Sequence, residues 1–156
     1  MNPDRREDLV AQYKDGYRVV AEALVGATDE ELDAHPAPGK WSAREIAHHL
    51  ADSETTSAIR LRRLIAEDNP DIAGYDEAEF ARRLYYDRPI EPSLDAFKAA
   101  RVTTAAILDR MTEAEWARAG THTEVGRYPV DRWLEIYAVH AHNHASQIRI
   151  ARASAR

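Results

Sequence analysis

Histidine is the residue type in this chain whose spacing points most directly to chemistry. His140 and His144 are four positions apart, and side chains at that spacing on a helix lean over the same turn. Two imidazoles placed in this way can bind one metal ion, and a third from a facing helix leaves the remaining coordination positions open. An open site is typical of a catalytic or substrate-binding metal, which lowers the pKa of a bound water or thiol.

Helical phase predicts the third imidazole within residues 41–67. Successive residues of a helix are rotated by about 100°, so that, relative to Ile46 as the inward reference, His49 lies about 60° away and His48 about 160° away. We therefore expect His49 to point inward and His48 to point to water. The three inward imidazoles that can converge on one ion are His49, His140 and His144.

The remaining histidines are expected to lie outside this cluster. His142 is rotated by about 160° from the middle of the inward stripe of its helix and should be solvated. His35 and His122 fall in stretches that are predicted to be surface loops. His122 can approach a substrate if its loop covers the site.

The metal site has a non-catalytic alternative. A single buried histidine is more often a hydrogen-bonded core residue, so the alternative is a bundle that binds a metal or small ligand without catalysis, or whose histidines simply pack. Each unsatisfied buried nitrogen would cost about 1–3 kcal/mol, and one ion would satisfy three of them together. Three neutral imidazoles suit zinc, nickel, cobalt or ferrous iron. Because free imidazole has a pKa of about 6.5, protons are expected to compete with the metal between about pH 7 and pH 5.

Three further polar residues lie close to the predicted site in helical phase. Gln147 is one turn beyond His144, where it can orient a ligand or hold a metal-bound water, or instead bond a neighbouring helix as a buried amide. Asp52 follows His49 by one turn and can accept from its free ring nitrogen, unless it lies exposed at the helix surface. Arg101 falls on an inward stripe, so it should either pair with a carboxylate or face the pocket, where it would bind an acidic substrate or a thiol cofactor.

The elements that must position these residues are four long helices. Apolar residues recur at spacings of three and four over about residues 4–25, 41–67, 92–111 and 130–152, as expected of amphipathic helices. Ser42 and Glu45 form a capping box at the second helix. The long connection 68–91 contains a short helix at 75–84 and is predicted to cross the bundle, so that the second and third long helices run parallel. We predict one all-α domain over residues 1–156, a four-helix bundle.

Composition restricts the class of protein. The chain has 156 residues, of which 44% are hydrophobic, enough for one core. Its net charge of −6 argues against nucleic acid as a partner, and no apolar run approaches the roughly 18 residues of a membrane span. The absence of cysteine excludes disulfides and a thiolate nucleophile and suits the cytoplasm. We therefore expect a cytoplasmic protein that acts on a small molecule.

Other common chemistries lack their motifs. The chain has no His-Glu-x-x-His sequence, so the general base of a zinc protease is not in its usual place. No two of the six glycines lie close enough to form a phosphate-binding loop. The serines near histidines lie at a helix cap or within a helix rather than on the strained turn that presents a nucleophile.

Two segments of the chain resemble a known family. The segment from Trp41 to Glu54, with its Trp-Ser start and the His49-Leu50 step, is similar to the second-helix signature of the DinB-like (YfiT-like) superfamily. The segment 126–130, followed by His140-x3-His144-x2-Gln147, resembles the closing pattern of that family.

This resemblance covers nearly the whole chain and implies a four-helix bundle with up-down-down-up topology, often a homodimer. It also implies that His49, His140 and His144 are the metal ligands. The activity that it implies is broad, because the family contains thiol S-transferases that use low-molecular-weight thiols such as bacillithiol, a mycothiol-dependent maleylpyruvate isomerase, and members known only by name as metal-dependent hydrolases. A fold shared by such different activities does not decide between a thiol and water as the nucleophile.

Overall fold

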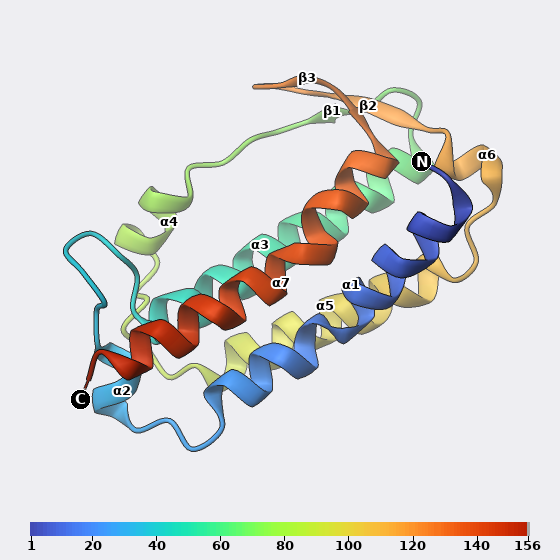
Figure 1. The fold of residues 1–156 in the computed structure, drawn as a ribbon. Helices are drawn as coiled ribbons and strands as arrows, with labels where there is room; N and C mark the ends of the chain where they lie inside the picture. Colours follow the sequence, from blue (N-terminus) through green and yellow to red (C-terminus); the bar gives the residue numbers. More distant parts are fainter. Residues whose placement is uncertain (156) are drawn as a thin grey trace.

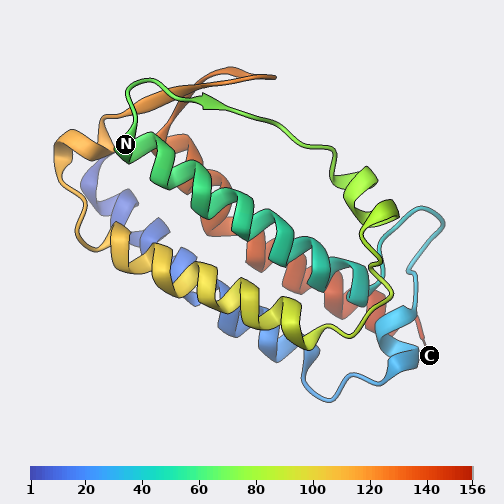
Figure 2. The ribbon, with the colours of Figure 1, turned by 180° about the vertical axis from the view of Figure 1, so that it is seen from behind.

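The computed structural model describes residues 1–155 of the chain. Its main body is a bundle of four long helices, α1 (Pro3–Leu24), α3 (Ala43–Ala66), α5 (Glu91–Leu108) and α7 (Val130–Ala153). Figures 1 and 2 show that α3 and α5 run in one direction and that α1 and α7 run in the opposite direction, which is an up-down-down-up order. The predicted four-helix bundle is confirmed. No helix within residues 1–155 has both the length and the apolar character needed to cross a membrane.

Short helices and strands lie in the connections between the long helices. The short helices are α2 (Asp29–Asp33), α4 (Glu77–Arg83) and α6 (Glu113–Trp116), and the strands are β1 (Asp71–Ile72), β2 (Ala119–His122) and β3 (Gly126–Pro129). Helix α4 lies in the crossover between α3 and α5, where the sequence predicts a short helix. Strands β2 and β3 form an antiparallel hairpin directly before α7, and β1 pairs with β2 in parallel.

This small sheet corrects the prediction of an all-α fold. Its strands have two to four residues each, which is too short for an alternating apolar pattern to stand out in the sequence. In addition, a Cβ atom on Gly120 of β2 would lie 2.5 Å from the carbonyl oxygen of Pro70. Gly120, which in the sequence alone is typical of a loop, thus permits the close approach of two backbone segments. The sheet lies at the end of the bundle where the crossover leaves α3 (Figure 1).

The capping box predicted at the start of α3 is present. The backbone N–H of Glu45 donates to Oγ of Ser42 at 3.2 Å, and the backbone N–H of Ser42 donates to Oε2 of Glu45 at 2.8 Å. These two bonds satisfy donors that the first turn of a helix leaves unpaired. They also fix where α3 begins and therefore the direction in which His49, two turns later, points.

His48 is buried, which corrects the prediction that it faces water. Its side chain is 0% exposed, and Nε2 donates to the carbonyl oxygen of Arg88 at 2.9 Å while Nδ1 accepts from Oγ of Ser93 at 2.8 Å. The prediction assumed that α3 has a single buried face, whereas the crossover covers the face opposite the bundle. His48 therefore anchors the end of the crossover to α3.

A buried ion pair connects all four long helices in the core. Arg101 of α5 is 2% exposed and Glu54 of α3 is 0% exposed, and Nε of Arg101 donates to Oε2 of Glu54 at 2.9 Å. The guanidinium group also donates to the carbonyl oxygen of Tyr13 on α1 and, at 2.8 Å, to that of Tyr137 on α7. The Tyr13 hydroxyl completes the network by donating to Glu54. Gly16 faces the guanidinium group at a point where a Cβ atom would overlap it.

Removing one charge of this pair is expected to destabilise the protein more than removing both. Arg101→Met leaves the Glu54 carboxylate buried without its cation and should lower the free energy of unfolding by about 3–5 kcal/mol. The double variant Arg101→Met/Glu54→Met should recover most of that loss, because neither charge remains in the core. Urea denaturation measures both values, and a double variant less stable than Arg101→Met alone would contradict this account.

Candidate metal centre

Three histidine side chains, one from α3 and two from α7, meet in the structure. Nε2 of His140 lies 3.4 Å from Nε2 of His49 and 3.1 Å from Nε2 of His144. One ring nitrogen from each of the three lies within 4.8 Å of those of the other two. The structure thus brings together the three histidines that helical phase selects, and the adjacent His48 points away from them to the crossover.

Aromatic rings flank two of these imidazoles. The ring of Trp41 lies 4.8 Å from that of His49, centre to centre, and the ring of Tyr137 lies 5.9 Å from that of His140 in an edge-on arrangement. Trp41 directly precedes the Ser42 cap of α3, and Tyr137 is one turn before His140 on α7. Both contacts limit the rotation of the imidazoles and shield them from water.

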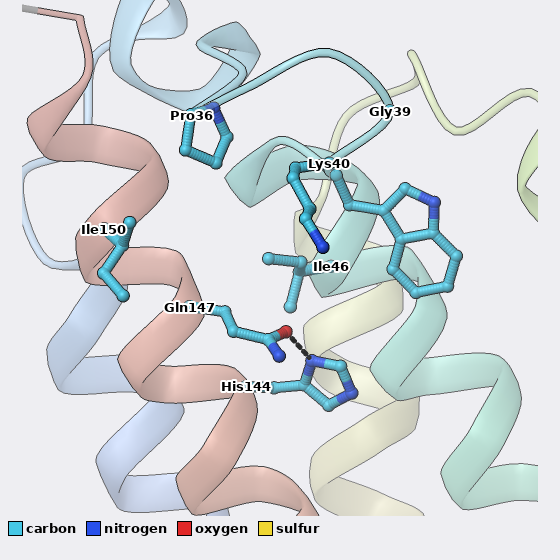
Figure 3. A pocket seen from close by; sticks show the side chains of 8 residues that line it. Pro36, Gly39, Lys40, Ile46, His144, Gln147 and Ile150 are labelled. Atoms are coloured by element: carbon cyan, nitrogen blue, oxygen red, sulfur yellow. Dashed lines mark hydrogen bonds between the residues drawn. The ribbon is translucent and has the colours of Figure 1, made fainter.

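Gln147 determines which nitrogen of His144 is free. Its Oε1 lies 2.8 Å from Nδ1 of His144 (Figure 3). An amide oxygen can only accept, so Nδ1 carries the proton and donates, and Nε2 keeps its lone pair. That lone pair faces the other two histidines. The contact is of the kind that orients metal-binding histidines, and the role of Gln147 in orienting a metal ligand stays a prediction.

Two of the three nitrogen separations fit a single metal ion. Imidazole nitrogens that bind one ion at about 2.0–2.1 Å, with angles of about 90–110° between them, lie about 2.8–3.4 Å apart. The two Nε2 separations of 3.1 and 3.4 Å fall within this range. The nitrogens of the third pair, His49 and His144, lie within 4.8 Å of each other.

The three imidazoles have too few N–H protons to satisfy one another by hydrogen bonding, which is consistent with a site for a cation. The Nε2 atom of His140 can donate at most one hydrogen between its two neighbours, so His49 and His144 compete for it. Nδ1 of His140 is itself buried and has no hydrogen-bond partner within the described part of the chain. A single divalent ion would accept a lone pair from each ring at once and remove this competition.

Burial keeps the three imidazoles neutral. Desolvation lowers the pKa of His49 to about 3 and the pKa of His140 to about 2, with a smaller contribution to each from the nearby His144. Burial also lowers the pKa of His144, whereas its hydrogen bond to Gln147 raises it. Neutral imidazole is the form that binds a metal, so His49 and His140 are in that form at neutral and mildly acidic pH.

Two predicted neighbours of the site have other partners. Asp52 accepts a hydrogen bond from the hydroxyl of Tyr86 in the crossover at 2.6 Å, and nothing in residues 1–155 joins it to His49 by a hydrogen bond. Arg101 is bound to Glu54 in the core. The predicted role of Asp52 as a partner of His49 is thus replaced by an anchor for the crossover, and Arg101 takes the paired rather than the pocket-facing role.

The other histidines depart in part from their predicted exposure. His142 is half-buried, and its Nε2 donates to the carbonyl oxygen of Gln12 at 3.0 Å, because α1 packs against this side of α7. His122 is only 7% exposed on β2, within the sheet that the sequence did not reveal. His35 is exposed, as predicted, and its Nδ1 bonds the carbonyl oxygen of Lys40 at 2.7 Å.

A cavity of about 590 Å³ opens beside the histidine cluster. Figure 3 shows the side chains of Lys40, Ile46 and Gln147 pointing into the same space, next to His144. The residues that line the cavity are Pro36, Gly39, Lys40, Trp41, Ile46, His144, Gln147 and Ile150. Such a volume is within the range of small-molecule sites. One of the three histidines, His144, thus lines a space that can hold a substrate.

Helical periodicity cannot identify Lys40 as a cavity residue, because it lies in the loop before α3 rather than on a helix. The available signal is its position, directly before the Trp-Ser start of a helix that carries a candidate ligand, in a loop that contains Pro36, Pro38 and Gly39. Loops of this kind, next to a rigid helix, are common places for binding residues.

Comparison with known proteins places the chain in a family. The family model of the DinB superfamily matches residues 12–148. A relative from Oceanobacillus iheyensis with the name "Putative metal-dependent hydrolase" is 32% identical over 141 residues, which are 90% of this chain and 82% of that protein. YfiT from Bacillus subtilis, which has a name of the same form, is 29% identical over 154 residues, covering 92% of this chain and 86% of YfiT.

A solved structure of YfiT from Bacillus subtilis, described as having an unusual four-helix bundle topology, agrees with the fold. It matches with a TM-score of 0.89 and 24% identity, over 95% of this chain and 86% of that chain. At this identity the likeness shows the fold alone, whereas the family model spans most of the sequence. The chain belongs to the DinB superfamily.

Proposed function

We propose that this chain is a metal-dependent enzyme in which His49, His140 and His144 bind one divalent ion. The observation that carries the proposal is the convergence of the three Nε2 atoms, two pairs of which lie 3.1 and 3.4 Å apart, beside the 590 Å³ cavity. A bound ion would lower the pKa of a coordinated water or thiol and so supply a nucleophile at neutral pH. Three nitrogen donors suit zinc, nickel, cobalt or ferrous iron.

The residues around the ligands have separate roles in this proposal. Gln147 holds His144 with its Nε2 lone pair toward the site. Trp41 packs on His49 and, with Ile46, forms part of the cavity wall. These side chains position the ligands, exclude water from part of the cavity and contact the apolar portion of a small substrate.

The lining of the cavity favours a low-molecular-weight thiol as the nucleophile. None of its described residues has a carboxylate, so the lining offers no general base of the kind that assists water in zinc proteases. A free thiol has a pKa of about 8.5, far below that of water, and ionises with less assistance. Since the chain has no cysteine, the thiol would come from a small molecule, and the reaction would be thiol S-transfer to an electrophile.

Hydrolysis is the second candidate, and the names of the relatives favour it. The relatives from Oceanobacillus iheyensis and Bacillus subtilis are both named for metal-dependent hydrolysis. Zinc-bound water can reach a pKa of about 7 without a carboxylate base. Water would then take the place that the thiol takes in the first candidate, at the same three ligands.

An activity comparison separates these candidates from a non-catalytic bundle. The metal-loaded protein is incubated with cysteine and 1-chloro-2,4-dinitrobenzene, and separately with 4-nitrophenyl acetate without thiol. Thiol transfer predicts that only the first reaction is accelerated above background and that His144→Ala abolishes the acceleration. Acceleration of the second reaction alone would support hydrolysis, and a metal-loaded protein that accelerates neither would favour a binding role.

Metal content is expected to depend on three histidines and not on their neighbours. His49→Ala, His140→Ala and His144→Ala should each lose stoichiometric metal, because each removes one donor of the set. His142→Ala is the matched control on α7, and it should keep about one equivalent per chain because its ring bonds the carbonyl oxygen of Gln12. Elemental analysis of untagged protein purified without chelator gives the ratio.

His48→Ala provides a second control next to a ligand. It should retain metal but unfold at a lower temperature, because it removes a buried side chain with two hydrogen bonds. Less than about a tenth of an equivalent of metal in the wild type would defeat the proposal. A requirement for His48 instead of His49 would show that the ligand set is wrong.

The stability of the metal-free protein is expected to fall as the pH is lowered through 6.5. In the unfolded chain His49 and His140 bind protons below a pKa of about 6.5, whereas in the folded protein their pKa values are about 3 and 2. The unfolded state therefore binds more protons between about pH 6.5 and pH 3, so stability declines over this window. Between pH 7.5 and pH 5.5 the two residues together should account for about 2–3 kcal/mol.

Denaturant titrations of the chelated protein at the two pH values measure this decline in stability. The double variant His49→Gln/His140→Gln is the comparison and should lack most of the decline.

The lowered pKa values of His49 and His140 also change the expected pH dependence of metal binding. Because folded His49 and His140 stay neutral at pH 5.5, the added thermal stability of the metal-loaded over the chelated protein should be similar at pH 7.5 and pH 5.5. A gap that disappears at pH 5.5 would indicate ligands that titrate like free imidazole.

A further inference from the structure

One lysine side chain points into the cavity and has no partner among the described residues. The chain has three lysines, and two of them have partners: Lys14 pairs with Asp109, and Lys98 lies over the ring of Tyr17 at 5.2 Å. The ammonium group of Lys40 has no hydrogen-bond or ion-pair partner within residues 1–155. Figure 3 shows this group directed toward Ile46 and the interior of the cavity.

The backbone of Lys40 is fixed although its side chain is exposed. Its N–H donates to the carbonyl oxygen of Ala37 at 3.0 Å, and its own carbonyl oxygen accepts from Nδ1 of His35 at 2.7 Å. Gly39, directly before it, has a φ of 75°, a left-handed conformation that favours glycine. The loop thus holds the base of the lysine in place, so that its ammonium group reaches a restricted part of the cavity.

Gln147 offers a second set of donors to the same space. Its Oε1 is occupied by the proton on Nδ1 of His144, so the amide NH₂ group remains to donate two hydrogen bonds. One ammonium group and one neutral amide provide a single positive charge and several donors. A monoanionic carboxylate, with two acceptor oxygens, matches this arrangement.

The rest of the lining is apolar. Pro36, Trp41, Ile46 and Ile150 provide most of the remaining side-chain surface, and no acidic residue is among the described lining residues. A phosphate would commonly be held by a planar arginine fork or by several backbone N–H groups at a helix N-terminus. The cavity has neither of these among its lining residues.

We propose that this cavity selects small molecules with one carboxylate on an apolar body, and that Lys40 is the residue that binds the carboxylate. The amide of Gln147 provides the second contact, and Trp41, Ile46 and Ile150 pack against the apolar body. This inference rests on the proposed function insofar as the ligand is the substrate of the metal centre. Binding of the carboxylate itself needs no ion.

The test therefore uses the full chain with its metal removed by a chelator and then dialysed. Calorimetric titration compares 3-phenylpropanoate with 3-phenylpropanamide, which differ mainly in charge. The wild type should bind the carboxylate about fivefold more tightly than the amide, the scale of an exposed ion pair. The preference should fall as salt is added. Without the ion, a carboxylate–metal bond cannot produce this result.

Variants assign the preference to Lys40. Lys40→Gln should bring the carboxylate-to-amide ratio close to one, and Lys40→Arg should retain part of it. Lys98→Gln is the matched control, because Lys98 lies on α5 and does not line the cavity. It should bind both probes like the wild type.

A second pair of variants tests the apolar wall. Ile150→Asn should weaken both probes alike, by roughly two- to fivefold for a partly exposed side chain. Ile136→Asn, an exposed isoleucine on the same helix that does not line the cavity, should leave both unchanged. This outcome places the apolar body of the ligand against α7.

Three results would overturn the inference: equal binding of the two probes to the wild type, a preference that survives Lys40→Gln, or tighter binding of phenyl phosphate than of 3-phenylpropanoate. The last would assign the cavity to phosphate esters. The outcomes also separate this inference from the proposed function. If the protein binds no metal but prefers the carboxylate, the inference stands and the enzyme proposal fails. If it binds stoichiometric metal but does not prefer the carboxylate, the enzyme proposal stands and the inference fails.

Discussion

The buried Arg101–Glu54 ion pair sets how the four helices lie against one another. A charge in the core is stable only while its partners remain in place, and Arg101 has partners on α1, α3 and α7. Sliding or rotating one of these helices would break a charge-assisted hydrogen bond. The carbonyl oxygen that α7 contributes belongs to Tyr137, one turn before His140, and Glu54 follows His49 on α3. The interaction that holds the core therefore also fixes the register in which His49 and His140 face each other at 3.4 Å.

The same burial that positions the histidines determines their chemistry. Desolvation lowers the pKa values of His49 and His140 and so keeps both rings neutral, with one nitrogen of each ring free of a proton. Burial also leaves Nδ1 of His140 without a hydrogen-bond partner within residues 1–155. An apolar surrounding thus leaves nitrogens that could bind a metal, at a cost to the fold that an ion bound as proposed would relieve. Metal affinity and fold stability are expected to be coupled for this reason.

The sequence was sufficient where one physical rule acts alone. The capping box at Ser42, the long helices and the inward direction of His49 follow from local hydrogen bonding and helical phase, and the structure shows each of them. The errors arise where a second element covers a surface that phase alone leaves to solvent. His48 is buried under the crossover, and His142 is half-buried because α1 packs beside it. Neither contact has a local signal, since each partner is more than 35 residues away in the chain.

The candidate metal-binding residues and the cavity lysine lie on different kinds of element. The three histidines lie on rigid helices, whereas Lys40 lies on the connection before α3 and is held by His35 and Gly39. A change in that loop can therefore alter what the cavity binds without moving the histidines. Trp41 joins the two parts, because it lines the cavity and packs on His49 at 4.8 Å. A ligand that shifts the indole would act on His49, and by thermodynamic reciprocity an ion that fixes His49 would then favour the same position of the indole.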